Sequence, residues 1–444
     1  MIVNVKESTV VCPAQDTPKG MSLLISNLGQ AARRTHGPRV YFYKANSSHN
    51  FFEAAILKDA LSKVLVPFYP LAGRLKKDHE SGKIVIDCND KGVLFVEAET
   101  DSFIDDLGDF VPSSSSDFRQ LAPTVDYTSD ISSFPLVVLQ VTRFKCGGVS
   151  LGVGIQHSVA DGSSGFRFIN AWSDMARGIN PATQHFIDQT NLRGRDPPMP
   201  AFQHIEFQPP PTLKDTANSQ SVPNTITTTT TSAAIFNFSR DQLHTLKAKA
   251  KEGIADTTTY YSTFEVLAGH TWRSACRARG LPDDQETKMY ISTNGRSRLS
   301  RPPIPPDYFG NAVFSATPIA VSGNLQSEQL EYAVGRIHET MVRMDEEYLR
   351  SALDFLELHL NQVALMHGTH FFRCPNIRII SWARMPTCDA DFGWGRPIFV
   401  GPTEMTLDGM AYILPSCMND GSLSLLIALE HDHMQLFKKF IHDI

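Results

Sequence analysis

The sequence predicts a mixed α/β fold built from two similar halves. Runs with the alternation of strands and runs with helical spacing follow each other along all 444 residues. The hydrophobic share of 42% is sufficient for sizeable cores. Between residues 193 and 234 the composition changes to prolines and threonines, which is typical of a partly flexible linker. We therefore expect an N-terminal unit at 1–192, a linker at 193–234 and a C-terminal unit at 235–444, with a ligand cleft between the units.

The first half alternates strands with helices. Residues 51–66 have helical spacing, and Pro67 and Pro70 end this run. A second helix is predicted at 166–175, and 113–116 is a polar loop. Strands are predicted at 2–6, 40–43, 84–86, 93–96, 136–141 and 148–155.

The second half repeats this mixture. Helices are predicted at 240–252 and 262–279, and residues 327–358 are expected to form more than one helix. Strands are predicted at 289–292, 313–319, 377–382 and 423–429.

Composition excludes several classes of protein. The net charge of −6 and the lack of a long basic run argue against nucleic acid as a partner. No apolar stretch is long enough to cross a membrane, and the N-terminus lacks a secretory signal, so we expect a cytoplasmic protein. The seven scattered cysteines contain no C-x-x-C pair; we interpret them as reduced core residues, with neither a disulfide framework nor a zinc site.

The motif at residues 156–162, Gln-His-Ser-Val-Ala-Asp-Gly, lies where a predicted strand ends and a helix begins. Histidine can take and return a proton near neutral pH, so His157 is a candidate general base, with Asp161 four positions on. No serine lies in a G-x-S-x-G elbow, which disfavours a Ser-His-Asp hydrolase. H-E-x-x-H and phosphate-binding glycine motifs are missing too, and His270 and Cys276 lack partners for zinc.

Two other clusters are open to more than one interpretation. Residues 294–298, Asn-Gly-Arg-Ser-Arg, are most simply a turn with solvated arginines; the alternatives are an anion site or an arginine partner for Asp161. Residues 389–397 alternate glycines with aromatic residues, which suits a packed, rigid loop.

These clusters together resemble a known family. The His157-x-x-x-Asp161-Gly motif, the Asp-Phe-Gly-Trp-Gly motif at 391–395 and the run Tyr-Pro-Leu-Ala-Gly-Arg at 69–74 are similar to the plant BAHD acyltransferases, which transfer acyl groups from coenzyme A. Runs at 144–149, 168–178 and 348–354 resemble the branch of hydroxycinnamoyl-CoA:shikimate/quinate hydroxycinnamoyltransferases, enzymes of phenylpropanoid metabolism.

The resemblance implies two chloramphenicol-acetyltransferase-like domains with a solvent channel between them, and a segment around 373–395 that packs with the N-terminal domain. It implies a monomer without metal or cofactor, with a coenzyme A thioester as co-substrate and a small-molecule acceptor. His157 would be the base, Asp161 would brace the turn against Arg296, and Trp394 would be scaffold. Trp382 would offer its indole N–H to the developing oxyanion, with core packing as the alternative. The residues implied for acyl-CoA binding are Ser262, Thr263, Arg298, Ser381 and Arg384.

Departures from the pattern concern the acceptor. The branch has an arginine where this chain has His367, and a threonine where it has Ile380. His36 and Tyr41 match the pocket-forming strand, but Arg39 replaces a small residue. Arg39 could supply a carboxylate handle from the opposite wall; a solvated arginine is the alternative. We expect shikimate or quinate as the acceptor; another hydroxy acid, a phenolic alcohol or an amine are the alternatives. A condensation-type domain and a non-catalytic binding protein are the alternatives from other classes.

Overall fold

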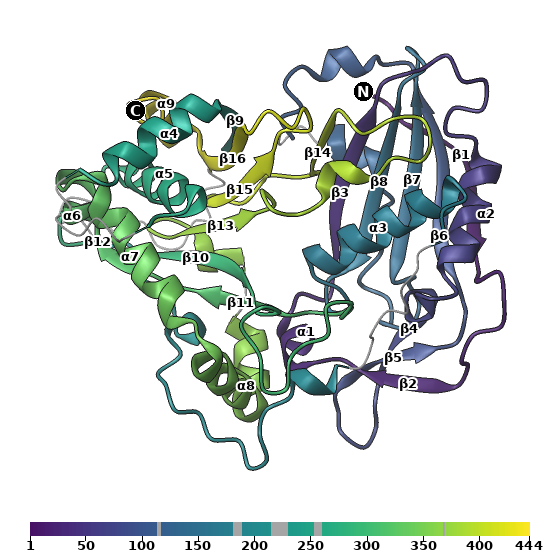
Figure 1. The fold of residues 1–444 in the computed structure, drawn as a ribbon, viewed down its shortest axis with the longest axis horizontal. Coiled ribbons are helices and arrows are strands. Elements are labelled where there is room, and N and C mark those ends of the chain that lie inside the picture. The colour runs from purple at the N-terminus through teal and green to yellow at the C-terminus, as the bar shows by residue number, and fades with distance from the viewer. Residues whose placement is uncertain (113–116, 181–188, 215–229, 253–259, 367–368) are drawn as a thin grey trace.

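The computed structural model describes residues 1–112, 117–180, 189–214, 230–252, 260–366 and 369–444. It contains two large sheets that lie side by side, with helices packed on each (Figure 1). The first has the strand order β1-β6-β7-β8-β3-β14, and the second the order β11-β10-β13-β15-β16-β9, with β12 paired to β10; a small sheet has the order β2-β5-β4. This confirms the mixed α/β fold, and the two-domain arrangement fits the chloramphenicol-acetyltransferase type.

The elements of the first half are these: β1 Asn4–Val11, β2 Met21–Leu24, α1 Asn27–Ala31, β3 His36–Tyr43, α2 Ala54–Val64, β4 Arg74–Lys77, β5 Ile84–Cys88, β6 Val93–Thr100, β7 Val137–Phe144, β8 Val149–Gln156 and α3 Gly162–Ala176. Every residue of β8 is buried, because β8 lies between β7 and β3 and is covered on both faces. The strand ends at Gln156 and delivers His157 to the edge of the sheet. Asp161 then caps α3 through its side chain, which accepts from the Ser164 N–H.

The elements of the second half are these: β9 Thr231–Phe238, α4 Arg240–Lys249, α5 Thr263–Arg279, β10 Glu286–Asn294, β11 Val313–Ala316, β12 Ile319–Val321, α6 Ser322–Ser327, α7 Leu330–Arg343, α8 Glu346–Met366, β13 Ile377–Ser381, β14 Phe399–Pro402, β15 Met410–Pro415, β16 Leu423–Glu430 and α9 His431–Phe440. Met289, Ile291, Ile379 and Ala411 alternate along the central strands and enter the main core of this half. Residues on the opposite face of the same strands line the cavity described below.

Two boundaries differ from the sequence-based expectation. Ile377–Ser381, inside the segment expected to pack with the N-terminal unit, is strand β13 of the second sheet. The chain crosses over after it, and β14 pairs with β3 of the first sheet, Val400 opposite Tyr41. Likewise β9 begins inside the predicted linker, at Thr231.

Part of the predicted linker is held against α8 by hydrogen bonds. Its proline-rich composition did not indicate this attachment. The Asp354 carboxylate of α8 accepts hydrogen bonds from the Arg195 N–H at 2.6 Å and the Met199 N–H at 3.0 Å. His204 is buried and lies between Glu206 and Ser351, at 2.9 and 2.8 Å. Residues 215–229 of the linker, like the loop at 113–116, lie outside the described residues.

The interpretation of the cysteines is wrong in two respects. Cys388 and Cys417 form a disulfide, with 5.4 Å between their Cα atoms. Cys12 and Cys146 are exposed rather than in the core. The pair was not apparent because the two residues are 29 positions apart, and they follow β13 and β15, which become neighbours only through the parallel pairing of these strands. In the described part of the chain, no helix is long and apolar enough to cross a membrane, and no three potential ligands gather into a metal site.

Candidate active site

The turn that carries His157 is held from both halves of the molecule. The backbone N–H of His157 donates to the Thr35 carbonyl at 3.0 Å. The Asn311 side-chain amide donates to the carbonyls of His157 and Ser158, each at 2.9 Å. Hydrogen bonds to the main chain of the turn, from both halves, therefore fix the position of the histidine Cα.

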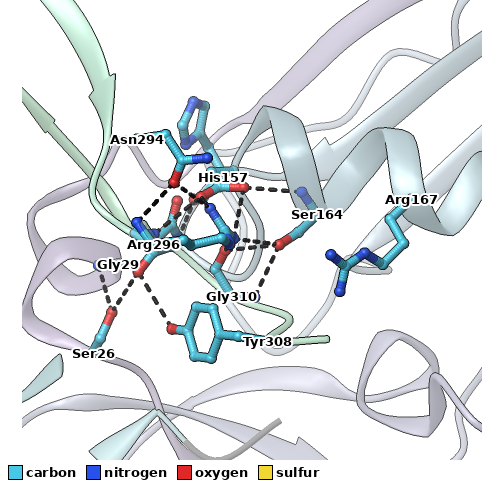
Figure 2. A network of polar contacts seen from close by, with 12 residues as sticks. Ser26, Gly29, His157, Ser164, Arg167, Asn294, Arg296, Tyr308 and Gly310 are labelled. Atoms are coloured by element: carbon cyan, nitrogen blue, oxygen red, sulfur yellow. Dashed lines mark hydrogen bonds and ion pairs between the residues drawn. The ribbon is translucent and has the colours of Figure 1, made fainter. Parts of the chain in front are cut away.

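Asp161 is fully committed to structure. The residue is 2% exposed. Its two carboxylate oxygens accept hydrogen bonds from the Arg296 guanidinium at 2.7 and 3.1 Å, from the Ser164 N–H at 2.9 Å and from the Ala312 N–H at 3.0 Å. Figure 2 shows Arg296 at the centre of this network. Each carboxylate oxygen of this bidentate pair already accepts two hydrogen bonds. Asp161 therefore has no free acceptor with which to orient or polarise the His157 imidazole.

Arg296 makes further contacts, so the interpretation of residues 294–298 as a turn with solvated arginines is wrong for this residue. Its Nη2 donates to Ser164 Oγ at 2.9 Å and to the Gly310 carbonyl at 3.0 Å. Its guanidinium lies 5.3 Å from the centre of the Tyr308 ring (Figure 2). Arg296, which belongs to the second half, thus connects Asp161, Ser164 and Gly310 at the start of α3.

The His157 imidazole lies deep within the protein, yet its surface is open because it faces an internal cavity. Its pKa is lowered from the usual value, chiefly because the surroundings disfavour the charged ring and next because of the positive charges of Arg378 and Arg39. A hydrogen bond with its own backbone carbonyl and the charge of Asp161 oppose this shift. The ring is therefore neutral at pH 7, the form that a general base requires.

The cavity beside His157 has a volume of about 250 Å³. Residues from both halves line it, and most of its wall is apolar. The lining residues used below are Arg33, His157, Glu206, Tyr290, Phe372, Arg378, Ile380, Met410 and Tyr412.

One wall of this cavity is the free face of the second sheet. Tyr290 of β10 is paired with Arg378 of β13, and Arg378 with Met410 of β15. One step further along the sheet, Ile380 is paired with Tyr412. Because alternate residues of a strand share a face, these side chains form a continuous wall.

Of the residues predicted for the acceptor, Ile380 lines this cavity. His36 is buried and bonded to the Tyr127 hydroxyl at 2.7 Å and the Pro135 carbonyl at 2.9 Å, and burial lowers its pKa to about 4. Tyr41 is also buried, which raises the pKa of its hydroxyl to about 12. His367 lies outside the described residues.

Arg39 is buried, so the alternative of a solvated arginine is wrong. It is 6% exposed, its guanidinium carbon lies 4.5 Å from the centre of the Phe166 ring, and a Cβ on Gly165 would come within 2.3 Å of its Nη2. Glycine at this position of α3 therefore makes room for the arginine. Its Nη1 is buried without a hydrogen-bond partner among the described residues.

Trp382 follows β13 and packs against Phe166 and Tyr412, with ring centres 5.1 and 5.2 Å away. Its backbone N–H donates to the Ile413 carbonyl at 2.8 Å. We find no hydrogen bond from its indole N–H to the described residues. The indole thus combines core packing with a donor that is free for another partner.

The five residues predicted for acyl-CoA binding do not line this cavity in the described part of the chain. Ser262 caps α5, and the Glu265 carboxylate of the same helix accepts a hydrogen bond from the Ser262 N–H at 2.6 Å. Arg298 donates to the carbonyls of Met341 and Met344 at the end of α7, at 2.8 and 2.7 Å. Thr263 is the first residue of α5, while Ser381 and Arg384 lie at and after the end of β13.

The loop at 391–395 is built as a rigid turn. Asp391 Oδ1 accepts from the N–H groups of Gly393 and Gly395 at 2.8 and 3.0 Å, and both glycines have φ near +100° (+99° and +105°). Phe392 and Trp394 pack into the aromatic cluster around Phe52. These contacts favour a scaffold role for Trp394.

Sequence reasoning missed Asn311, Arg378 and Arg33. Asn311 follows Gly310 in a loop that resembles an ordinary turn, and the sequence contains no sign that its amide reaches His157. Arg378 lies in a predicted strand of apolar residues, where an arginine is unusual. That exception was a usable signal for a functional side chain.

Comparisons with known proteins agree with the motifs. The model of the Transferase family matches residues 1–443. The chain is 56% identical to a shikimate O-hydroxycinnamoyltransferase of Nicotiana tabacum and 51% identical to a hydroxycinnamoyltransferase of Narcissus pseudonarcissus, with all of each chain covered. The crystal structure of vinorine synthase superposes with a TM-score of 0.72 at 21% identity, covering 98% of this chain and 96% of that one, which supports the fold. The chain therefore belongs to the Transferase family, as a BAHD acyltransferase that uses coenzyme A thioesters.

Proposed function

We propose that this enzyme transfers a hydroxycinnamoyl group, such as p-coumaroyl or caffeoyl, from coenzyme A to an acceptor hydroxyl, with shikimate or quinate as the first acceptors to test. The observation that carries the proposal is the position of His157: a neutral imidazole on a turn fixed by both halves, facing a cavity that can hold a small hydroxylated acceptor. The full-length similarity to hydroxycinnamoyltransferases supports the donor.

The proposed reaction needs one base and one donor to the oxyanion. A neutral imidazole has one ring nitrogen with a free lone pair, and Nε2, the ring nitrogen farther from the main chain, is proposed for this role. Nε2 would take the proton as the acceptor oxygen attacks the thioester carbonyl carbon. The carbon–sulfur bond then breaks, and the imidazolium returns the proton to the coenzyme A thiolate.

Trp382 is proposed as the donor to the negative oxygen of the tetrahedral intermediate. Its packing between Phe166 and Tyr412 holds the indole in one orientation. A donor that is already oriented costs no rearrangement when charge develops. Asp161 and Arg296 would act by holding the turn, without touching the reacting atoms.

The coenzyme A site is proposed around Ser262, Thr263, Arg298, Ser381 and Arg384. Arg384 is exposed, and the start of α5 presents backbone N–H groups that suit a phosphate. Glu265 in the first turn opposes an anion there, so Arg384 is the better first target for mutation. Cytoplasmic location, a monomeric state and the lack of any cofactor stay predictions.

The test is incubation of the pure protein and p-coumaroyl-CoA with a panel of acceptors, read by product mass. His157→Ala should lower kcat by roughly 10²–10⁴-fold, the usual contribution of a general base, while p-coumaroyl-CoA still binds. His79→Ala, which changes an exposed histidine, is the matched control. Substantial turnover by His157→Ala would contradict the role as base.

A further inference from the structure

We propose that Arg378 is the residue that selects the acceptor, by binding a carboxylate of the acceptor in the cavity beside His157. The inference rests on the proposed acyl transfer and moves the carboxylate handle from Arg39 to the opposite sheet. It assigns the acceptor to the hydroxy acids rather than to neutral phenolic alcohols or amines.

The first argument is position. Arg378 and His157 both line the cavity, and among charged side chains Arg378 has the largest effect on the pKa of His157. The strand pairing puts Arg378 between Tyr290 and Met410 on the cavity wall. An acceptor held by Arg378 would therefore present its hydroxyl within reach of the imidazole.

The second argument is the unbalanced charge. The Arg378 side chain makes no ion pair or hydrogen bond with the described residues; its guanidinium carbon lies 4.8 Å from the centre of the Phe372 ring. Its pKa is lowered by burial and by the nearby charge of Arg33, which lines the same cavity, and raised by Tyr412. A largely desolvated guanidinium without a counter-ion is costly, and an anionic ligand in the cavity would relieve that cost.

The protein does not supply that anion from the cavity wall. Glu206 is the one acidic side chain among the described lining residues. One of its oxygens is bonded to His204 at 2.9 Å and the other accepts from the Tyr348 hydroxyl at 2.6 Å. Glu206 therefore serves the anchored linker and does not neutralise Arg378.

Hydroxyl groups complete the site. The Tyr290 hydroxyl is buried at the cavity wall without a hydrogen-bond partner among the described residues. The phenol of Tyr412 is close enough to Arg378, Arg33 and Arg39 for each of these charges to lower its pKa, although burial raises it overall. A planar guanidinium flanked by phenolic hydroxyls suits a carboxylate, which accepts several hydrogen bonds at once.

Arg39 is less suited to this role. It does not line the cavity, and its guanidinium is enclosed between Gly165 and Phe166 of α3. Its charge instead acts on His157 at a distance, in the same direction as that of Arg378. Arg39→Met should therefore change the pH dependence of the reaction more than acceptor selectivity.

The test compares acids with their own neutral analogues. Shikimate, quinate and malate are each assayed beside the corresponding methyl ester, with p-coumaroyl-CoA as donor. We expect the wild-type enzyme to prefer the acids. Arg378→Met should raise KM for the acids roughly 10–100-fold, the range for a lost charged hydrogen bond, and leave KM for the esters and for p-coumaroyl-CoA nearly unchanged. Arg378→Lys should restore part of the difference, because the charge returns without the planar fork.

Arg373→Met is the matched control, since Arg373 is an exposed arginine near Arg378 that does not line the cavity. Equal KM values for acids and esters in the wild-type enzyme would overturn the proposal without any variant. Transfer to neutral acceptors alone would overturn it and leave acyl transfer intact. If calorimetry shows that the acids bind and that their binding depends on Arg378, but no acylation occurs, the role of Arg378 in carboxylate binding would stand and the proposed function would be overturned.

Discussion

At the scale of single residues, the acidic and basic members of the motif at 156–162 have separate tasks. Asp161 is consumed by four hydrogen bonds, of which three come from Arg296 and Ala312 of the second half. His157 is left with its own carbonyl and the cavity. The pKa of the imidazole is therefore lowered by its desolvated surroundings and by the charges of Arg378 and Arg39, while the charge of Asp161 acts against this shift without a direct hydrogen bond.

This leads to a prediction about pH. Because the pKa of His157 is lowered, the neutral base persists below pH 6.5, and the acid limb of kcat/KM should fall below that pH. Removing a nearby positive charge, as in Arg378→Met, lets the pKa rise and should move this limb to higher pH. Rate profiles with a methyl ester acceptor measure the effect without the contribution of carboxylate binding. An acid limb above pH 7 in the wild-type enzyme would contradict the assigned environment.

Sequence reasoning succeeded at residues whose roles are local and failed at those that depend on strand register. The spacing of His157 and Asp161, and the start of a helix at Ser262, are visible in the sequence. The position of Arg378 on the cavity wall depends on its pairing with Tyr290, 88 positions earlier in the chain. No periodicity in a single strand contains that information.

At the scale of elements, the predicted helices and strands of both halves are mostly found, and several of the missed strands have a physical explanation. β14 and β15 were missed because each is short and contains glycine, proline or methionine rather than a run of branched residues. β9 was missed because its threonines and alanines resemble the linker before it. Its pairing with β16 along eight residues gives it a stability that its composition does not indicate.

The rigid loop at 391–395 gives a prediction at this scale. Phe392 is 1% exposed and packs against Trp172 of α3 and Phe52, with ring centres 4.8 and 5.6 Å away. Phe392→Ala should lower the free energy of unfolding by about 3–5 kcal/mol, the usual cost of such a cavity. KM for both substrates should change little in the protein that remains folded. A large rise in KM with unchanged stability would show that the loop touches substrate.

At the scale of the whole molecule, the contact between the halves runs through the catalytic turn. Asp161→Ala would leave Arg296 without its counter-ion and remove the cap of α3. We expect a loss of about 3–5 kcal/mol in the free energy of unfolding, as for other broken buried ion pairs. Asp59→Ala, which removes an exposed pair with Lys63, should cost about 0–1 kcal/mol. Urea unfolding followed by tryptophan fluorescence compares the two, and similar losses would contradict the structural role of Asp161.

The hydrogen bonds from Asn311 to the carbonyls of His157 and Ser158 have a further consequence for how substrates arrive. A hinge motion that separated the two halves would have to break these hydrogen bonds, and the Asp161–Arg296 ion pair, in every catalytic cycle. The two halves should therefore stay together throughout turnover. Each substrate must then reach His157 by diffusing through an opening between them. Bulky acceptors would then be rejected by the width of the entrance rather than by the strength of binding.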